Sequence, residues 1–291
     1  MGDQQSPATL ETLKLTDGFT ITRMGYGAMQ LAGPQVFGPP EDRDRAVAVL
    51  REAVALGITH IDTAGFYGPV VTNEIIREAL YPYAEPVRIA TKVGARRGED
   101  GSWLSSLDPQ DLKTQVYENL EHLGLSVLDL VYLRLASHEG TTDTSLAEEF
   151  TALAELRQEG VIRHLGLSGV SSAQLTEAQA IAPVVAVQNL YNLVNRQDDA
   201  LVERAAHENI AFASFFPLGG FTPLQSGTLT AVARRLDASP QQVALAWLLQ
   251  RSPTSVVIPG TTSVAHLREN VLAARLELPA DAVRELDAIG A

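Results

Sequence analysis

Short apolar runs alternate with helical patterns eight times along this chain, and this repeat restricts the possible folds more than any other feature. The runs are continuously apolar, as expected of parallel strands that are buried on both faces. Strand–helix alternation over roughly 250 residues favours a closed barrel over an open sheet. We therefore predict an α/β fold, a (β/α)8 TIM barrel, with strands at residues 24–28, 58–63, 87–93, 128–135, 161–168, 184–189, 210–218 and 255–258.

Several connections carry their own local signals. Ser145 and Ser171 are each followed three residues later by Glu148 or Gln174, which is the spacing of a capping box at a helix start. The segment 94–107 has no clear period, and we predict that it is a long loop.

The ends of the domain follow from composition. Asp17-Gly18 lies between two short apolar-alternating runs and predicts a β-hairpin ahead of the barrel. Residues 1–12 are expected to be a mobile tail, because most of them are polar and terminal. No linker-like change in composition follows, so residues 13–291 are predicted to form a single domain.

Charge and residue usage exclude several classes of function. The formal net charge of −13 disfavours nucleic acids and anionic membranes as partners. The absence of cysteine excludes disulfides and thiolate chemistry, and the six histidines are not spaced as metal ligands. No apolar run reaches about 18 residues and no signal-peptide core is present, so a cytoplasmic protein is expected. The oligomeric state is not predicted.

Polar side chains at the predicted strand ends suggest a reactive site. In such barrels chemistry lies at the C-terminal ends of the strands. Asp62, Lys92 and Arg134 all stand there, and Tyr67 lies in the turn after Asp62. A carboxylate can hold an ammonium that lowers the pKa of a phenol from its usual value of about 10. The alternatives are a purely structural ion-pair cluster and a packed tyrosine.

The motifs resemble those of the aldo-keto reductases over nearly the whole chain, from about Leu13 to Ala288. Many separate blocks occur in the order found in that family. They are Gly25-Tyr-Gly-Ala-Met29, His60-Ile-Asp-Thr-Ala-x-x-Tyr67, Ile89-Ala-Thr-Lys92, Leu123-Gly-Leu with Asp129-Leu-Val-Tyr132, Gly166-Leu-Ser168, Val187-Gln188-Asn-x-Tyr-Asn192, Pro217-Leu-Gly219, and Ile258-Pro-Gly260 with Glu269-Asn270.

The resemblance implies a reaction and a cofactor. Tyr67 would give a proton to a carbonyl oxygen that receives hydride from NADPH. Lys92 would lower the pKa of Tyr67, and Asp62 would pair with Lys92. The implied cofactor site consists of Met29, Asp62, Ser168, Gln188, Phe215, Phe216, Pro217, Leu218, Gly219, Gly220, Ile258, Gly260, Thr261, Ser263, His266, Glu269 and Asn270.

Three departures from the family pattern stand out. Arg134 replaces the usual histidine of the fourth strand, and His138 is not expected to take over its role. Gly169 stands where the family often has asparagine. Near the expected 2′-phosphate the chain offers His266 and Arg268 but no lysine beside Pro259, and NADPH is still favoured over NADH.

The substrate is suggested by a closer resemblance. The Gly-Pro-Pro segment 38–40, the loop with Trp103, and Arg134 itself resemble the bacterial pyridoxal-reductase-like branch of the family. Pyridoxal carries an aldehyde beside a phenolate oxygen, and an always-cationic guanidinium on Arg134 could pair with that oxygen and help to depress the Tyr67 pKa. Tyr67, Trp103 and Arg134 are thus the predicted substrate residues. Arg96 and Arg97 are expected to be solvated.

Two other functions remain open. A Schiff-base aldolase would use Lys92 as a nucleophile, although the partner Asp62 would raise the lysine pKa and work against it. A non-catalytic subunit that senses NADPH and signals through other proteins is the second alternative, and the missing histidine favours it.

Overall fold

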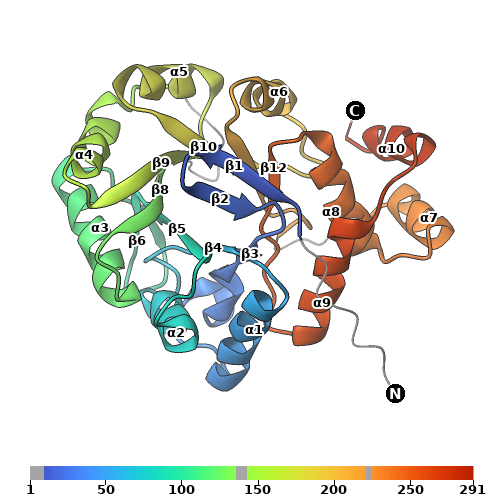
Figure 1. The fold of residues 1–291 in the computed structure, drawn as a ribbon, viewed down its shortest axis with the longest axis horizontal. Helices are drawn as coiled ribbons and strands as arrows, with labels where there is room; N and C mark the ends of the chain where they lie inside the picture. Colours follow the sequence, from blue (N-terminus) through green and yellow to red (C-terminus); the bar gives the residue numbers. More distant parts are fainter. Residues whose placement is uncertain (1–9, 136–142, 221–223, 291) are drawn as a thin grey trace.

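The computed structural model describes residues 10–135, 143–220 and 224–290. Within them, eight parallel strands form one sheet (Figure 1). From edge to edge these are β12 (Ser255–Val257), β11 (Ala211–Phe215), β10 (Val184–Leu190), β9 (Ile162–Ser168), β8 (Leu128–Arg134), β5 (Arg88–Val93), β4 (His60–Asp62) and β3 (Tyr26–Gly27).

The two edges of the sheet meet, which confirms the predicted barrel. Met24 forms a parallel bridge with Val257, and the Gly25 amide donates to the Val257 carbonyl over 2.8 Å. The backbones come very close at this seam: a Cβ on Gly27 would lie 2.3 Å from the carbonyl oxygen of Ile258, and one on Gly260 would lie 2.6 Å from that of Gly27. Only glycine allows this approach.

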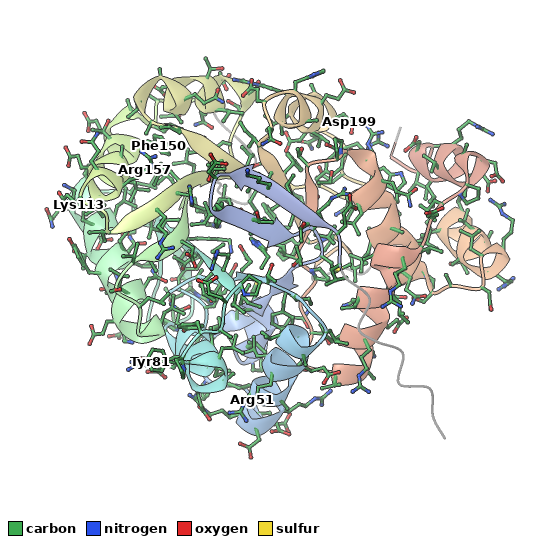
Figure 2. All side chains as sticks on the ribbon, in the orientation of Figure 1. Arg51, Tyr81, Lys113, Phe150, Arg157 and Asp199 are labelled. Carbon is green, nitrogen blue, oxygen red and sulfur yellow. The ribbon has the colours of Figure 1, made fainter. Side chains whose placement is uncertain are left out.

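Helices surround the strands, and α7 and α10 lie farther out, beside α8 (Figure 1). In α1, Val47 and Leu50 enter the core, whereas Arg51 lies on the solvent side (Figure 2). This spacing is that of an amphipathic helix. The helices are α1 (Arg43–Ala55), α2 (Val71–Leu80), α3 (Pro109–Leu123), α4 (Ala147–Gln158), α5 (Ser172–Ile181), α6 (Asp199–His207), α7 (Gly227–Arg235), α8 (Pro240–Arg251), α9 (Val264–Leu272) and α10 (Ala280–Asp287).

The predicted hairpin, β1 (Thr12–Thr16) and β2 (Phe19–Thr22), lies across one end of the barrel (Figure 1). Its apolar side chains, among them Phe19 and Ile21, join the side chains that fill the barrel interior. That end is therefore closed by packing. Of the segment predicted to be a tail, residues 1–9 lie outside the described residues, while Leu10 is buried and Thr12 already begins β1.

The segment predicted as a loop at 94–107 contains a second hairpin. Strands β6 (Ala95–Arg97) and β7 (Trp103–Ser105) pair antiparallel, with Arg97 opposite Trp103. The prediction of an irregular loop is therefore wrong. Strands of three residues are too short for their period to be recognised.

One of the two predicted capping boxes is also wrong. Helix α4 is preceded by Leu146 and has no side-chain cap. Ser145 instead donates to a carboxylate oxygen of Glu177 over 2.6 Å, and the other oxygen accepts from the Leu146 amide. Glu177, which is distant in sequence, thus accepts the hydrogen bond from the backbone ahead of α4, a role that the predicted capping box would have given to a nearby side chain. The box of Ser171 and Gln174 is confirmed.

Candidate active site

Asp62 and Lys92 form a buried ion pair at the C-terminal ends of neighbouring strands. Lys92 Nζ lies 2.5 Å from Asp62 Oδ1, and each side chain is only 4% exposed. The ammonium also donates to the carbonyl of Thr63 over 3.0 Å. Burial tends to lower the Lys92 pKa, but Asp62 and Tyr67 raise it above its usual value. Lys92 is therefore a cation, which argues against a Schiff-base role.

Tyr67 lies in the turn after β4, and its side chain is buried against this pair. Lys92 Nζ is 5.2 Å from the centre of the Tyr67 ring, and its positive charge acts to lower the pKa of the Tyr67 hydroxyl. Burial raises the pKa of Tyr67 above its usual value, and the charges of Lys92 and Arg134 lower it by less. Lys92 acts in the predicted direction, while burial acts against it more strongly because it leaves the phenolate poorly hydrated.

Arg134, at the end of β8, faces the same site. Its guanidinium carbon lies 5.8 Å from the centre of the Phe66 ring and 5.7 Å from that of Trp103. Its side chain forms no hydrogen bond or ion pair with another residue that the structure describes. Burial lowers its pKa, and Tyr67 partly offsets this. His138, the alternative considered for this role, lies outside the described residues.

Gln188 reaches Asp62 from the other side of the barrel. Its amide donates to Asp62 Oδ2 over 2.8 Å. Ser168 pairs with Gln188 in register at the end of β9 and is buried. After it, Gly169 has a φ of +70°, and its amide donates to the side-chain oxygen of Asn189 over 2.9 Å. The neighbouring strand thus supports the backbone at the position where the family often has asparagine.

A buried polar network supports the turn that carries Tyr67. The Thr63 hydroxyl donates to Asn73 over 2.8 Å, and the Asn73 amide donates to Asn119 over 2.8 Å. Asn119 also accepts from the Thr91 hydroxyl over 2.6 Å. All four side chains are at most 3% exposed. Because a buried polar group without a partner costs free energy, this network holds the turn in one arrangement.

The residues expected to hold a cofactor lie on two adjacent segments at the same end of the barrel. The first begins at Phe215, the last residue of β11, and in it Phe216 adopts a φ of +52° and its carbonyl accepts from Asn192 over 3.1 Å. The second follows β12 and leads into α9, where Ser263 caps the helix by accepting from the His266 amide over 3.4 Å. The first segment holds Phe215, Phe216, Pro217, Leu218, Gly219 and Gly220; the second holds Ile258, Gly260, Thr261, Ser263, His266, Glu269 and Asn270. Met29 follows β3, which meets β12 at the seam.

The contacts at the start of α9 reveal a residue that sequence reasoning missed. Arg45, on α1, donates to the carbonyl of Thr262 over 2.8 Å and so brings a cation to this helix N-terminus. Arg268, which was expected near a 2′-phosphate, instead pairs with Glu52 over 2.7 Å. Nothing in the local sequence marks Arg45, because its contact lies 217 positions away.

Arg96 and Arg97 are not solvated as predicted. Arg96 pairs with Asp111 over 2.5 Å and with Glu118 over 3.1 Å. The Arg97 guanidinium lies 4.1 Å from the centre of the Trp103 ring. These arginines therefore hold the β6–β7 hairpin in place beside Tyr67.

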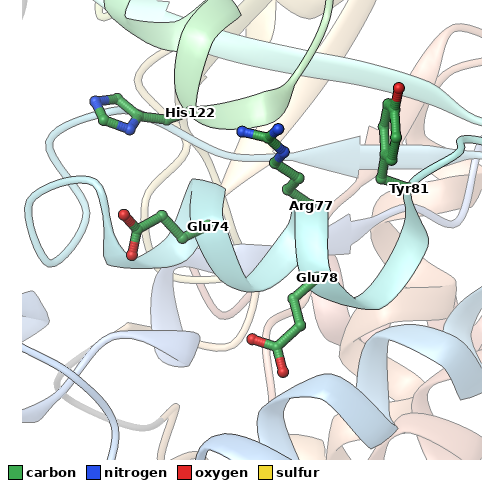
Figure 3. Close-up of a pocket in the computed structure, with 5 residues that line it drawn as sticks. All are labelled: Glu74, Arg77, Glu78, Tyr81 and His122. Carbon is green, nitrogen blue, oxygen red and sulfur yellow. The ribbon is translucent and has the colours of Figure 1, made fainter.

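A cavity of about 200 Å³ borders this site and has Phe66, Lys92 and Arg97 in its lining, whereas others lie on the outer surface. One of about 420 Å³ opens on the helical exterior (Figure 3). It is lined by Glu74, Arg77 and Glu78 of α2, by Tyr81 directly after that helix, and by His122 of α3. Among the described residues no group of three or more His, Asp or Glu side chains is placed to hold a metal ion. In the same part of the chain, no helix combines the length and apolarity needed to cross a membrane.

Comparison with known proteins agrees with this geometry. Residues 23–291 match the model of the "Aldo/keto reductase family". The chain is 57% identical over 272 residues to pyridoxine 4-dehydrogenase of Escherichia coli K12, covering 93% of this chain and 95% of that protein. It is 40% identical over 280 residues to an uncharacterized oxidoreductase of Schizosaccharomyces pombe, covering 96% and 90%.

Solved structures share the fold. A thermostable aldo-keto reductase crystallised with the inhibitor epalrestat superposes with a TM-score of 0.81 at 28% identity, over 97% of this chain and all of that one. An aldo-keto reductase of Klebsiella pneumoniae in complex with NADPH gives 0.77 at 22% identity, over 96% and 95%. The predicted family resemblance and its bacterial branch are confirmed. This chain belongs to the aldo/keto reductase family.

Proposed function

We propose that this protein is a cytoplasmic NADPH-dependent reductase that converts a carbonyl group to an alcohol, with pyridoxal as its candidate substrate and pyridoxine as the product. The observation that carries the proposal is the buried chain of Asp62, Lys92 and Tyr67 beside the guanidinium of Arg134. The Escherichia coli relative is named for oxidation of pyridoxine, and the proposed reaction is the reverse.

The residues present fit a nicotinamide dinucleotide. The buried Ser168 hydroxyl makes no side-chain hydrogen bond to another described residue, so it is available to a ligand amide. The start of α9 is a helix N-terminus, and Arg45 adds a positive charge there, both suited to a phosphate. When bound, the cofactor supplies hydride. Ser168 and Gln188 would hold its nicotinamide end beside Phe215, and the segment from Ile258 to Asn270 would hold its adenosine end.

Tyr67 would act as the acid. Its raised pKa keeps the phenol protonated at neutral pH, so a proton is ready when negative charge develops on the carbonyl oxygen. The ammonium of Lys92 then stabilises the phenolate that remains. Asp62 holds that ammonium in position and is itself held by Gln188.

Arg134 would select the substrate. A phenolate oxygen beside an aldehyde can accept from its guanidinium while the aldehyde oxygen faces Tyr67. Trp103 and Phe66, both near Arg134, offer aromatic surface for a flat ring. A small aldehyde such as methylglyoxal lacks both contacts.

Turnover of a substrate panel tests the proposal. Purified protein with NADPH is given pyridoxal, methylglyoxal, sugar aldehydes and aromatic ketones, and kcat/KM is compared. Arg134→Gln is expected to lower kcat/KM for pyridoxal by about tenfold or more, with a smaller loss for methylglyoxal. Arg163→Gln, at the exposed opposite end of the barrel, is the matched control.

The panel also separates the alternatives. An equal loss for both aldehydes in Arg134→Gln would remove the substrate assignment while leaving the reductase. Tight NADPH binding without turnover of any carbonyl would instead support the sensor subunit.

A further inference from the structure

Arg97 contacts two segments of the site rim that are separate in sequence, residues 35–37 and 101–103. Its guanidinium lies 4.1 Å from the centre of the Trp103 ring and 5.2 Å from that of Phe37. It also donates to the carbonyls of Gly101 over 2.7 Å and Val36 over 2.6 Å. The N–H groups of the planar guanidinium fork thus donate to backbone carbonyls, while its flat face lies over aromatic rings. Lysine cannot reproduce this arrangement.

The backbone to which Arg97 donates these hydrogen bonds is strained. Gln35 and Val36 have φ values of +56° and +59°. A positive φ is rare for residues other than glycine and is an outlier for a β-branched one such as Val36. Such strain persists only where surrounding contacts hold it. Arg97 donates to the carbonyls of both residues, at 3.2 Å for Gln35.

The same backbone contacts the turn that carries Tyr67. The Gly68 amide donates to the Val36 carbonyl over 3.2 Å, so this one oxygen is shared by Gly68 and Arg97. The buried Val36 side chain packs in one cluster with Phe66 and Tyr67, and Trp103 packs against that cluster. The position of Trp103 and that of the tyrosine turn are therefore coupled through Arg97 and Val36.

We propose that Arg97 is a positioning residue that fixes Trp103 as a wall of the substrate site and thereby favours flat aromatic carbonyls over small ones. This inference rests on the proposed carbonyl reduction, but its structural part does not depend on turnover. Arg97 acts through Trp103 and the 35–36 backbone and donates no proton to the reaction.

Tryptophan fluorescence tests the structural part. The chain has two tryptophans, and Trp247 is only 1% exposed, so quenching by acrylamide reports mainly on Trp103. Arg97→Ala is expected to raise the quenching constant about twofold or more, because the indole loses its cationic cover. Arg163→Gln, at the exposed opposite end of the barrel, should leave it unchanged. Unchanged quenching in Arg97→Ala would overturn the proposal.

Kinetics test the functional part. In Arg97→Ala the ratio of kcat/KM for pyridoxal to that for methylglyoxal is expected to fall by about three- to tenfold. The loss should appear mainly in KM for pyridoxal. If quenching rises and the ratio stays constant, Trp103 does not set selectivity and the inference fails. Absence of any turnover in the unaltered protein would remove the proposed function, and the fluorescence result would still decide on Arg97.

Two further variants keep the proposal testable if Arg97→Ala does not fold. Arg97→Lys keeps the charge without the fork and should give intermediate quenching; a result identical to the unaltered protein would contradict the role of the fork. Gln35→Gly accepts a positive φ without strain. Added to Arg97→Lys, it should bring quenching back toward the original value, and failure to do so would contradict the link to backbone strain.

Discussion

The Gln188 amide donates to Asp62 across the barrel, over 2.8 Å, between strands that are separated by β9, β8 and β5 in the sheet. Lys92 occupies the other oxygen of the same carboxylate. Both oxygens of Asp62 are therefore engaged inside the protein, and its part in the proposed reaction is to hold Lys92 and not to transfer a proton.

Replacing Asp62 with asparagine should destabilise the protein. Asp62→Asn leaves the Lys92 ammonium buried without its counter-charge, which costs about 3–5 kcal/mol. Urea unfolding measures this loss. The double variant Asp62→Asn with Lys92→Met should recover much of the stability without activity. A double variant no more stable than Asp62→Asn alone would show that the loss has another cause.

Replacing Tyr67 with phenylalanine should remove the acid and little else. Turnover is expected to fall by about 10²- to 10⁴-fold, while NADPH affinity and thermal stability stay close to the original. The ring still fills its cluster beside Val36 and Phe66. Tyr117→Phe, on the exposed side of α3, is the control. Activity retained in Tyr67→Phe would exclude Tyr67 as the proton donor.

The pH dependence should differ between the two directions. Burial raises the pKa of Tyr67, so the phenol stays protonated beyond the ordinary tyrosine value of about 10. Carbonyl reduction needs the protonated phenol, so its rate should not fall through deprotonation of Tyr67 between about pH 6 and 9. Alcohol oxidation needs the phenolate and should rise with pH throughout. A fall in the rate of reduction near pH 7 would contradict the raised pKa of Tyr67 as the proton donor.

Removing Arg45 should affect NADPH and not NADH. Its guanidinium lies beside the start of α9, where the proposed 2′-phosphate would bind. Arg45→Gln should raise KM for NADPH about tenfold, which is the worth of one charge-assisted hydrogen bond. Arg51, on the same helix, donates to the Ala79 carbonyl, and Arg51→Gln serves as the control. Equal effects on both cofactors would place the phosphate elsewhere.

His60 should make the stability depend on pH. Its ring nitrogens have no partner within the described residues, and burial lowers its pKa to about 4 from 6.5. The unfolded chain binds the proton first, so the stabilisation is complete above 6.5 and is lost as pH falls toward 4. The loss amounts to about 3 kcal/mol.

Urea unfolding at several pH values between these limits measures the slope. His60→Leu should flatten it, and His207→Leu, exposed on α6, should not. A slope that survives in His60→Leu would have to come from another group.

Strand ends were predictable from the sequence because burial on both faces leaves a long apolar run, and a charge at its end is conspicuous. Asp62 and Lys92 were found in this way. Local sequence patterns predicted contacts less well where a residue distant in sequence makes the contact. Glu177 takes the place of the expected cap at Ser145, and Arg45 reaches Thr262 with no signal in its own neighbourhood.

Two further differences have physical causes of the same kind. The net pKa of Tyr67 depends on burial, which no motif reveals. The β6–β7 hairpin is made of strands too short to show a period, and the Arg97 contacts with Val36 and Trp103 exist only once that hairpin forms.

The seam between Arg23–Gly27 and Val257–Gly260 joins the first barrel strand to the last one that the ribosome makes. Until residue 257 has emerged from the ribosome, β3 and β11 each present an unpaired edge, and such edges invite pairing with other chains. Fragments that stop before Ser255 should therefore aggregate in cells rather than accumulate as folded intermediates, because the ring can close only once Val257 is available to pair with Met24.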